Sequence, residues 1–250
     1  MSDDLQSKWP NLKGGLAAAT IIGAWGTTLV VLLSSDLNLQ GLWWALPALL
    51  LQTFLYTGLF ITAHDSMHGT VTPDYPRLNR VVGWAAVILY ALFSFRKLRT
   101  LHWEHHRHPA SQHDPDYHDG EHSGFWSWYL HFMKGYLSVG QILGMALVFN
   151  IMQHLLGVPV VNLLCFWVAP ALLSTVQLFY FGTYLPHREP DGGYEDHHRA
   201  QTKDFHPAIS FLTCYHFGYH WEHHERPDLP WWALPRFRQG AKWQQRSQSS

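Results

Sequence analysis

The sequence predicts an all-α integral membrane protein, with four transmembrane helices, further interfacial or re-entrant helices and a cytoplasmic cap rich in histidine. Charged residues make up only 14% of the 250 residues, and aromatic residues reach 15%. Soluble domains average about 25% charged residues, and Trp and Tyr concentrate at membrane interfaces. The formal net charge of −1 gives no general attraction for nucleic acid, which is therefore not an expected partner.

Four segments without Asp, Glu, Lys or Arg are the predicted spans. A helix needs about 20 apolar residues to cross a hydrocarbon core of about 30 Å. Four buried helices of a soluble protein are the alternative, but a soluble domain seldom buries so many helices that are apolar all round. The spans are 14–35, 41–63, 138–157 and 160–185. They belong to a single expected domain, 1–250, with a disordered tail at about 239–250.

The distribution of Lys and Arg predicts which side of the membrane the loops occupy. The connectors near 36–40 and 157–160 contain no Lys or Arg, whereas the opposite side holds most of them. By the positive-inside rule, both termini and the long loops are cytoplasmic. The apolar segment 79–95 then begins and ends on one side, so it lies in the interface or re-enters. Residues 124–137, which are aromatic and interrupted by charge, indicate an interfacial helix.

Histidines at regular spacing cluster at the cytoplasmic ends of these spans. His64 and His68 are four residues apart, which places them about 40° apart on one helix face. The pentapeptide HWEHH occurs at 102–106 and again at 220–224, and its three imidazoles fit within an arc of about 100°. His216, one turn before the second copy, is expected on the same face. The Glu of each copy points away and is expected to meet Arg or a hydrogen-bond partner.

The number of imidazoles on this side favours two metal ions. About eight to ten ligands exceed the roughly four that one zinc takes, and imidazole binds iron, zinc and copper well. His187, isolated at the end of the fourth span, lies at the same depth. The candidate ligands are His64, His68, His102, His105, His106, His187, His216, His220, His223 and His224.

These three histidine boxes resemble those of the membrane desaturase and hydroxylase superfamily, whose members hold two non-haem irons and activate O₂. Longer stretches are similar to the bacterial β-carotene ketolases. They are AHDSMHG (63–69), HHRHPASQHDPDYH (105–118), FYFGTYLPHR (179–188) and CYHFGYHWEHHERPDLPWWALP (214–235). The resemblance covers about 14–237 and implies that the box histidines bind two Fe ions, with O₂ as co-substrate. Related desaturases have Asn–x3–His after the fourth span. Here Thr183 replaces the Asn, so only His187 is carried over.

The resemblance implies an enzyme that introduces keto groups at C4 and C4′ of β-ionone rings, taking β-carotene to echinenone and canthaxanthin. Two successive hydroxylations at one carbon, followed by dehydration, give the ketone. A carotenoid ring hydroxylase or a lipid desaturase would use the same boxes. A zinc hydrolase is disfavoured because His–Glu–x–x–His is absent. A metal transporter is disfavoured because its ligands would lie within the spans rather than at their ends.

Other residues beside the boxes have expected supporting roles. Asp65, Asp114 and Asp116 are expected to orient imidazoles or tune the metals, although HDPDYH is also typical of a turn. No Gly-rich dinucleotide fingerprint is present, so a ferredoxin-like electron donor is expected beside the carotenoid substrate and membrane lipid. The resemblance places the chain in a bacterial cytoplasmic membrane. Apolar residues proposed to line the substrate slot are Phe60, Trp84, Leu89, Phe93, Tyr180 and Phe181.

Overall fold

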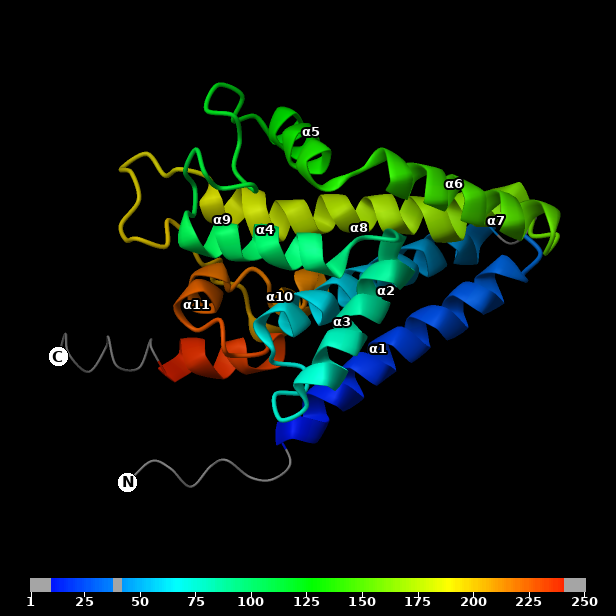
Figure 1. Cartoon of the computed structure of the whole chain (residues 1–250), viewed down its shortest axis with the longest axis horizontal. Helices are drawn as coiled ribbons and strands as arrows, with labels where there is room; N and C mark the ends of the chain where they lie inside the picture. The colour runs from blue at the N-terminus through cyan, green and yellow to red at the C-terminus, as the bar shows by residue number, and fades with distance from the viewer. Residues whose placement is uncertain (1–9, 38–41, 241–250) are drawn as a thin grey trace. The chain divides into compact units, whose positions relative to one another are not determined.

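The computed structural model of the chain describes residues 10–37 and 42–240, and its regular secondary structure is helical. The predicted all-α class is confirmed. Two compact units make up the chain, and Figure 1 shows their helices. The first unit comprises the described residues up to Lys97 together with Leu137–Thr175, and the second comprises Leu98–Tyr136 together with the described residues from Val176 onward.

Three helical segments are long and apolar enough to cross a membrane: Lys13–Leu33, Trp43–His68 and Val160–His187. Helix α1 (Pro10–Leu33) matches the first predicted span. Helix α2 (Leu42–His68) matches the second and continues past residue 63. Because the helix does not stop where the apolar run stops, the first pair of histidines belongs to the spanning helix itself.

The last predicted span is one helical run built from five successive pieces. Two pieces are π-helical, a form that occurs mostly as short bulges and often near functional sites. The second of these lies directly before the segment that ends at His187. A π-helical turn holds more residues than an α-helical turn, so it changes the direction in which the His187 side chain points from the helix. The pieces are α7 (Val160–Leu163), η2 (Leu164–Val168), α8 (Ala169–Phe179), η3 (Tyr180–Tyr184) and α9 (Leu185–His187).

The predicted span at 138–157 differs from expectation. Helix α6 (Val139–His154) reaches the length of a span only when it is counted with α5 (Phe125–Tyr136), and a sharp bend separates the two. Ser138 lies at the break, where its side chain accepts a hydrogen bond from the Gln141 N–H and caps the start of α6. A second bent pair is present, so the described residues contain three candidate spans, or up to five if each bent pair is one span, a range that includes the predicted four.

That second pair contains the predicted interfacial or re-entrant segment at 79–95. Helix α3 (Pro76–Ala91) ends at Leu92, which adopts the left-handed conformation, and α4 (Phe95–Arg107) begins after a short break. The segment is therefore a short helix that stops and changes direction, and its position in the interface or as a re-entrant helix stays a prediction.

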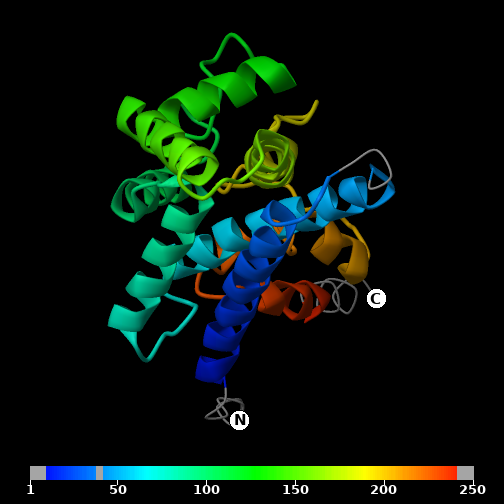
Figure 2. The same cartoon turned by 90° about the vertical axis from the view of Figure 1, so that its right-hand side faces the viewer.

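Within the first unit, α2 packs against both α1 and α3 (Figure 1 and Figure 2). Polar side chains join α3 to the end of α2. Ser66 Oγ donates to the Asn79 carbonyl at 2.6 Å, and Asn79 Nδ2 donates to the Ser66 carbonyl at 2.7 Å. Ser66 lies between His64 and His68, so α3 fixes the stretch of α2 that carries the two histidines.

Gly83 of α3 permits this close approach of α3 to α2. A Cβ atom at Gly83 would overlap Ser66 Oγ and a ring carbon of Phe95. We expect Gly83→Ala to destabilise the protein by about 1–3 kcal/mol, as overpacking typically does. Gly23→Ala in α1 is the matched control, because its Cβ would meet no atom within 4 Å. Thermal unfolding in detergent measures both variants, and equal unfolding temperatures would contradict the close packing.

The second unit contains α5, most of α4, and the C-terminal helices. Helix α10 (Pro207–Cys214) ends at Tyr215 in the left-handed conformation, and α11 (His220–Glu225) carries the last histidine box. A 3-10 turn at Trp231–Ala233 leads into a helix at 234–240. Residues 239 and 240 of the predicted tail are thus helical, and the remainder of that tail lies outside the described residues.

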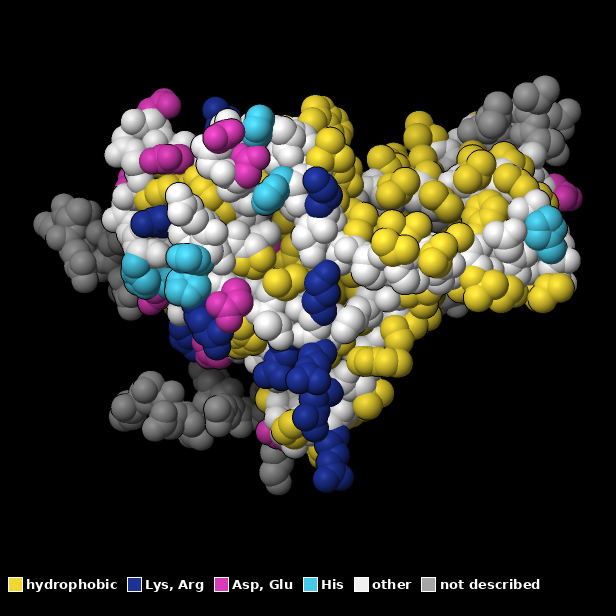
Figure 3. All heavy atoms as spheres, turned by 45° about the horizontal axis from the view of Figure 1, so that its top comes forward, with side chains coloured by type: hydrophobic (Ala, Val, Ile, Leu, Met, Phe, Trp, Pro, Cys, Tyr) yellow, Lys and Arg dark blue, Asp and Glu magenta, His cyan; other side chains and the backbone are white. Residues whose placement is uncertain are grey.

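Large apolar side chains are exposed along the long helices. Figure 3 shows hydrophobic side chains gathered over one part of the surface, while Lys and Arg gather on another. Soluble monomers rarely expose contiguous apolar surface of this extent. This supports the membrane association of the protein. Exposed members include Leu16, Val30, Trp43, Leu46, Leu50, Ile142, Leu143 and Leu147.

Candidate metal centre

Four buried histidines converge in the second unit: His105 of α4, His187 of α9, and His220 and His224 of α11. Their ligand nitrogens all lie within 4.8 Å of one another. The Nε2 atoms of His105 and His224 are 3.1 Å apart, and those of His224 and His220 are 3.2 Å apart. His187 Nε2 is buried without a hydrogen-bond partner. We call these residues the four-histidine group.

Two members of this group, His105 and His187, are oriented by hydrogen bonds at Nδ1, while their Nε2 atoms belong to the group. Both carboxylate oxygens of Asp114 lie 3.0 Å from His105 Nδ1, and the backbone carbonyl of Arg199 lies 2.9 Å from His187 Nδ1. Each acceptor favours a proton on Nδ1. In the neutral ring the lone pair of Nε2 is then free to bind a metal, as in most histidine metal sites. Burial lowers the pKa of His105, but the carboxylates of Asp114 and Asp116 outweigh it and raise that pKa to about 9, so a metal at His105 displaces a proton from Nε2.

The four-histidine group fits a metal cation on two grounds. Burial, reinforced by the imidazoles of His106 and His220, holds the pKa of His224 well below its usual value, so this ring is neutral. Neutral imidazole is the form that binds metals. The ligand nitrogens of the four residues also lie within 4.8 Å of one another, and His187 Nε2 has no hydrogen-bond partner, so a single cation among them would satisfy a buried lone pair. Imidazole suits iron, zinc and copper.

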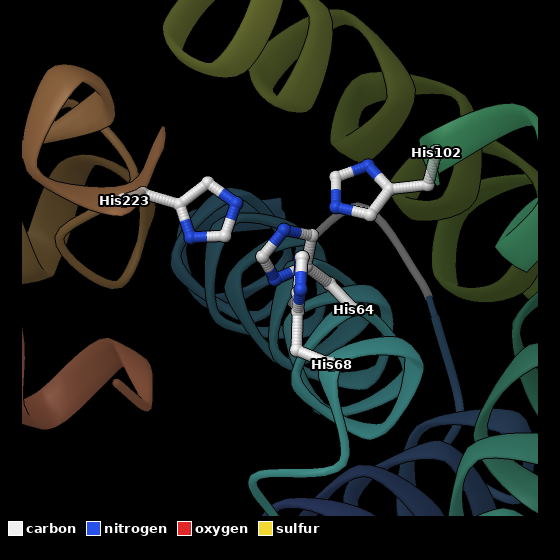
Figure 4. A group of neighbouring side chains, drawn as sticks. All are labelled: His64, His68, His102 and His223. Carbon is white, nitrogen blue, oxygen red and sulfur yellow. The ribbon is translucent and has the colours of Figure 1, made fainter. Parts of the chain in front are cut away.

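A second histidine group in the same unit comprises His102 and His106 of α4 and His223 of α11. His106 Nε2 lies 3.1 Å from His102 Nε2 and 3.0 Å from His223 Nε2. Figure 4 shows the rings of His102 and His223, which are nearly parallel with centroids 6.0 Å apart. We call these residues the three-histidine group.

The two copies of HWEHH therefore divide their histidines between two groups in a reciprocal way. In the first copy, His102 and His106 join the three-histidine group, while His105 joins the other. In the second copy the pair, His220 and His224, joins the four-histidine group, while His223 joins the other. Side chains four residues apart point in similar directions from a helix, whereas the side chains of His105 and His223 point in a different direction from their neighbouring pair. Both copies lie in helices, so the expected arc of about 100° still holds the three imidazoles of each copy, and within that arc they divide between two groups.

His64 and His68 lie on the end of α2 in the first unit. Their ring centroids are 4.9 Å apart, and Figure 4 shows both rings on the same side of the helix. Asp65 is buried, and its carboxylate lies 3.3 Å from His64 Nδ1. The i, i+4 spacing thus brings the two imidazoles together, as the sequence predicted.

His216 does not follow the sequence-based geometry. It was expected one helical turn before His220, but α10 has already ended, and His216 has a positive φ of 64°. Its ring stacks on Tyr219, with centroids 5.7 Å apart, and lies near Trp231. Burial lowers its pKa to about 4. Because the chain is not helical there, the argument from a shared helix face is wrong, and His216 belongs to neither group.

Asp114 and Asp116 form a turn that also orients His105. Asp114 accepts hydrogen bonds from the backbone N–H of Ala110 at 2.7 Å and of Asp116 at 2.8 Å. Asp116 Oδ2 lies 3.8 Å from His105 Nδ1. The two interpretations of this sequence, a turn and an orienting carboxylate, both describe the structure.

Glu222 lies on the reverse side of α11, away from the imidazoles. It is buried, and it accepts hydrogen bonds from Thr202 Oγ1 and from Arg238 Nη1, the latter at 2.5 Å. Arg238 also donates to Asp204 at 3.0 Å. In the first copy, Glu104 pairs with Arg107 at 2.6 Å. The expectation that both glutamates find polar partners is confirmed.

We expect Arg238→Gln to destabilise the protein by at least about 2 kcal/mol, because it leaves the Glu222 carboxylate buried without its cation. Arg236→Gln is the matched control, since Arg236 is exposed on the same helical segment. Chemical or thermal unfolding of the two variants measures the difference. If both lose the same stability, the ion pair does not hold α11.

The proposed substrate-contacting residues are dispersed. In the first unit, Phe60 and Phe93 both pack on Tyr90, with ring centroids 5.9 and 6.0 Å away. Leu89 is half-buried, whereas Trp84 is 59% exposed. In the second unit the rings of Tyr180 and Phe181 lie 5.0 Å apart. The structure thus brings two of these residues together around Tyr90 and leaves Trp84 on the surface.

Sequence reasoning missed Arg199, which helps hold the four-histidine group. Its backbone carbonyl binds His187, and its guanidinium donates to the Ala110 carbonyl at 2.9 Å. Arg199 has a positive φ of 45°, which is uncommon for a non-glycine residue. A contact made by a backbone carbonyl depends on no residue type, so it leaves no motif in the sequence.

The chain is similar to known proteins of one family. The family described as Fatty acid desaturase matches residues 41–248. A Haematococcus lacustris protein named β-carotene ketolase is 46% identical over 74% of this chain and 59% of its own length. A Chlamydomonas reinhardtii zeaxanthin 4-ketolase is 41% identical over 92% of this chain and 54% of its own length. A Paracoccus β-carotene ketolase is 42% identical over 74% of this chain and 76% of its own length.

The chain thus spans little more than half the length of the Haematococcus and Chlamydomonas relatives and about three quarters of the Paracoccus protein. The family match nevertheless includes all three histidine boxes and His187. The chain belongs to the fatty acid desaturase family, in which its relatives include proteins named β-carotene ketolase.

Proposed function

We propose that this protein is an O₂-dependent di-iron β-carotene 4-ketolase, which converts β-carotene to echinenone and canthaxanthin. The names of the relatives support the substrate class and the position of oxidation. The observation that carries the proposal is the reciprocal division of the HWEHH histidines. It provides two separate sets of imidazole ligands from two short helices.

The four-histidine group would hold one iron through His105, His187, His220 and His224. The three-histidine group would hold the other. We also propose His64 and His68 as iron ligands, because they offer a preformed i, i+4 pair of imidazoles. When bound, the irons and O₂ together supply the oxidant for the allylic C4–H bond.

The residues of the chain contribute ligand orientation and a dry environment. Asp114 and the Arg199 carbonyl hold protons on His105 Nδ1 and His187 Nδ1, which keeps each Nε2 directed at the metal position. All four histidines of this group are buried, so water has little access to them. An all-imidazole ligand set brings no negative charge, unlike the carboxylate-rich sites of soluble di-iron bundles.

Two hydroxylations at C4, followed by loss of water from the geminal diol, give the ketone. We propose that Phe60, Leu89, Phe93, Tyr180 and Phe181 contact the apolar substrate, because carotenoid sites are expected to be lined by apolar and aromatic side chains. Trp84, whose side chain is exposed, remains a further proposed contact. Since one relative is named for zeaxanthin, a 3-hydroxylated ring is a second substrate to assay.

We further propose that the protein lies in a bacterial cytoplasmic membrane with its histidine boxes on the cytoplasmic side. The absence of Lys and Arg from the connectors near 36–40 and 157–160 supports this orientation. Electrons would come from a separate ferredoxin-like donor. The exposed residues Arg96, Lys97 and Arg99 offer it a positively charged surface.

Expression in a bacterium that accumulates β-carotene tests the function. We expect echinenone and canthaxanthin to appear in the pigment extract, identified by chromatography and mass. A variant in which His105 is replaced by alanine is the control and should leave β-carotene unchanged. Accumulation of zeaxanthin or of desaturated lipids, without ketocarotenoids, would refute the proposal in favour of a hydroxylase or a desaturase.

A further inference from the structure

The turn that orients His105 is attached to α5 by two aromatic residues. Trp128 is 1% exposed, and its indole Nε1–H donates to the backbone carbonyl of Asp116 at 2.8 Å. The hydroxyl of Tyr136, two turns further along the same helix, donates to Asp116 Oδ1. Both bonds end on Asp116, one at its backbone and one at its side chain.

From Asp116 a short series of hydrogen bonds leads to the metal position. The backbone N–H of Asp116 donates to Asp114 Oδ1 at 2.8 Å. The same carboxylate accepts from His105 Nδ1 at 3.0 Å, and His105 Nε2 faces the other members of the four-histidine group. A shift of Asp116 therefore moves the acceptor that sets the rotation of the His105 ring.

We propose that Trp128 and Tyr136 are positioning residues for His105. By holding Asp116 at two points, they fix Asp114 against the imidazole and so set the direction of His105 Nε2. This inference rests on the proposed role of the four-histidine group as a metal site.

Packing around Trp128 supports this role. Its ring lies edge-on to Tyr117 and His118, with centroids 5.1 and 4.9 Å away, so the indole also contacts the residues that follow Asp116. On another side it packs against Phe179 at 5.9 Å. The turn is therefore packed against α5 as well as held by its own hydrogen bonds. Because loops are generally more mobile than the elements they connect, this packing restrains the turn.

The test uses two conservative variants, Tyr136→Phe and Trp128→Phe, which remove the hydrogen-bond donors and keep an aromatic ring. Their matched controls are Tyr75→Phe and Trp126→Phe, because Tyr75 is 62% exposed and Trp126 is 64% exposed. The metal-free full-length protein is loaded with Co²⁺ alone. Its visible absorption reports the geometry of the metal ligands, which a purely structural role would leave unchanged in the folded fraction.

We expect the Co²⁺ absorption bands of both Tyr136→Phe and Trp128→Phe to shift, and metal affinity to fall roughly 3–10-fold, less than the 10–100-fold typical of direct partners. In the ketolation assay, kcat should fall while KM for the carotenoid stays constant. Controls should match the unaltered protein. Spectra and affinities equal to those of the controls would overturn the inference, as would a loss confined to unfolding temperature.

The Co²⁺ measurement requires no carotenoid, so its outcome is independent of the ketolase proposal. If the unaltered protein produces no ketocarotenoid but the spectra shift, the proposed function fails and the positioning role stands. If ketocarotenoids form normally and the spectra do not shift, the positioning role fails alone. Tyr136→Phe removes one oxygen atom only, so it keeps the test decisive if Trp128→Phe does not fold.

Discussion

Replacement of His187 by alanine is expected to lower the iron content from about two to about one per chain and to abolish ketocarotenoid formation. His187 is 1% exposed, and its Nε2 faces the other three members of the four-histidine group. The alanine variant leaves three imidazoles around that position. Because metal binding depends on a complete set of deprotonated ligands, we expect the iron at this group to be lost and the other to remain.

Iron measured by elemental analysis of the purified protein, together with pigment analysis of the producing cells, checks this result. His154→Ala is the control, because His154 is exposed at the end of α6 and belongs to neither group. It should retain about two irons and full ketolation. A His187→Ala protein that keeps both irons would show that His187 is not a ligand, whatever happens to its activity.

The second large effect is expected from Asp114→Asn. Each carboxylate oxygen of Asp114 faces His105 Nδ1 and also accepts one backbone N–H, from Ala110 or from Asp116. The amide of asparagine must place an NH₂ group against one of these N–H donors. Either the turn opens or His105 loses its acceptor. Residues that orient metal-binding histidines typically contribute 10–100-fold to metal affinity or activity, and we expect a loss of about that size.

Asp119→Asn is the matched control for this change. Asp119 is an exposed turn residue that accepts from the backbone N–H groups of Glu121 and His122. Its replacement should leave metal affinity unchanged. Competitive metal titration of both variants gives the comparison. Equal affinities would mean that the Asp114 carboxylate does not orient His105 in a way that matters for binding.

Much of the fold could be predicted from hydropathy and spacing. Long uncharged segments predicted helices, because only a helix satisfies its own backbone hydrogen bonds in lipid. The limits of those helices were harder to predict. Helix α2 continues to His68 because a helix does not have to break where it leaves the membrane, and α6 is separated from α5 at Ser138, whose side chain caps α6. Such endings depend on single side-chain contacts that hydropathy does not register.

The candidate metal centre could likewise be predicted only in part. The i, i+4 spacing of His64 and His68 directly predicted the pairing of their rings. The spacing argument failed for His216, because the left-handed residues Tyr215 and His216 interrupt the helix on which it relied. Neither residue is glycine, so no local signal marked the interruption.

The sequence by itself determined the helical membrane class, the family and the candidate metal-binding residues, because composition, motifs and local spacing carry this information. Only the tertiary structure decided how those residues are combined. It divided each HWEHH between two groups, brought His187 to His105, and used Asp114, Arg199 and α5 to orient the rings. These choices depend on contacts between segments up to 119 residues apart. Spacing along one helix fixes the relative directions of its side chains, but the packing between helices decides which residues those side chains contact.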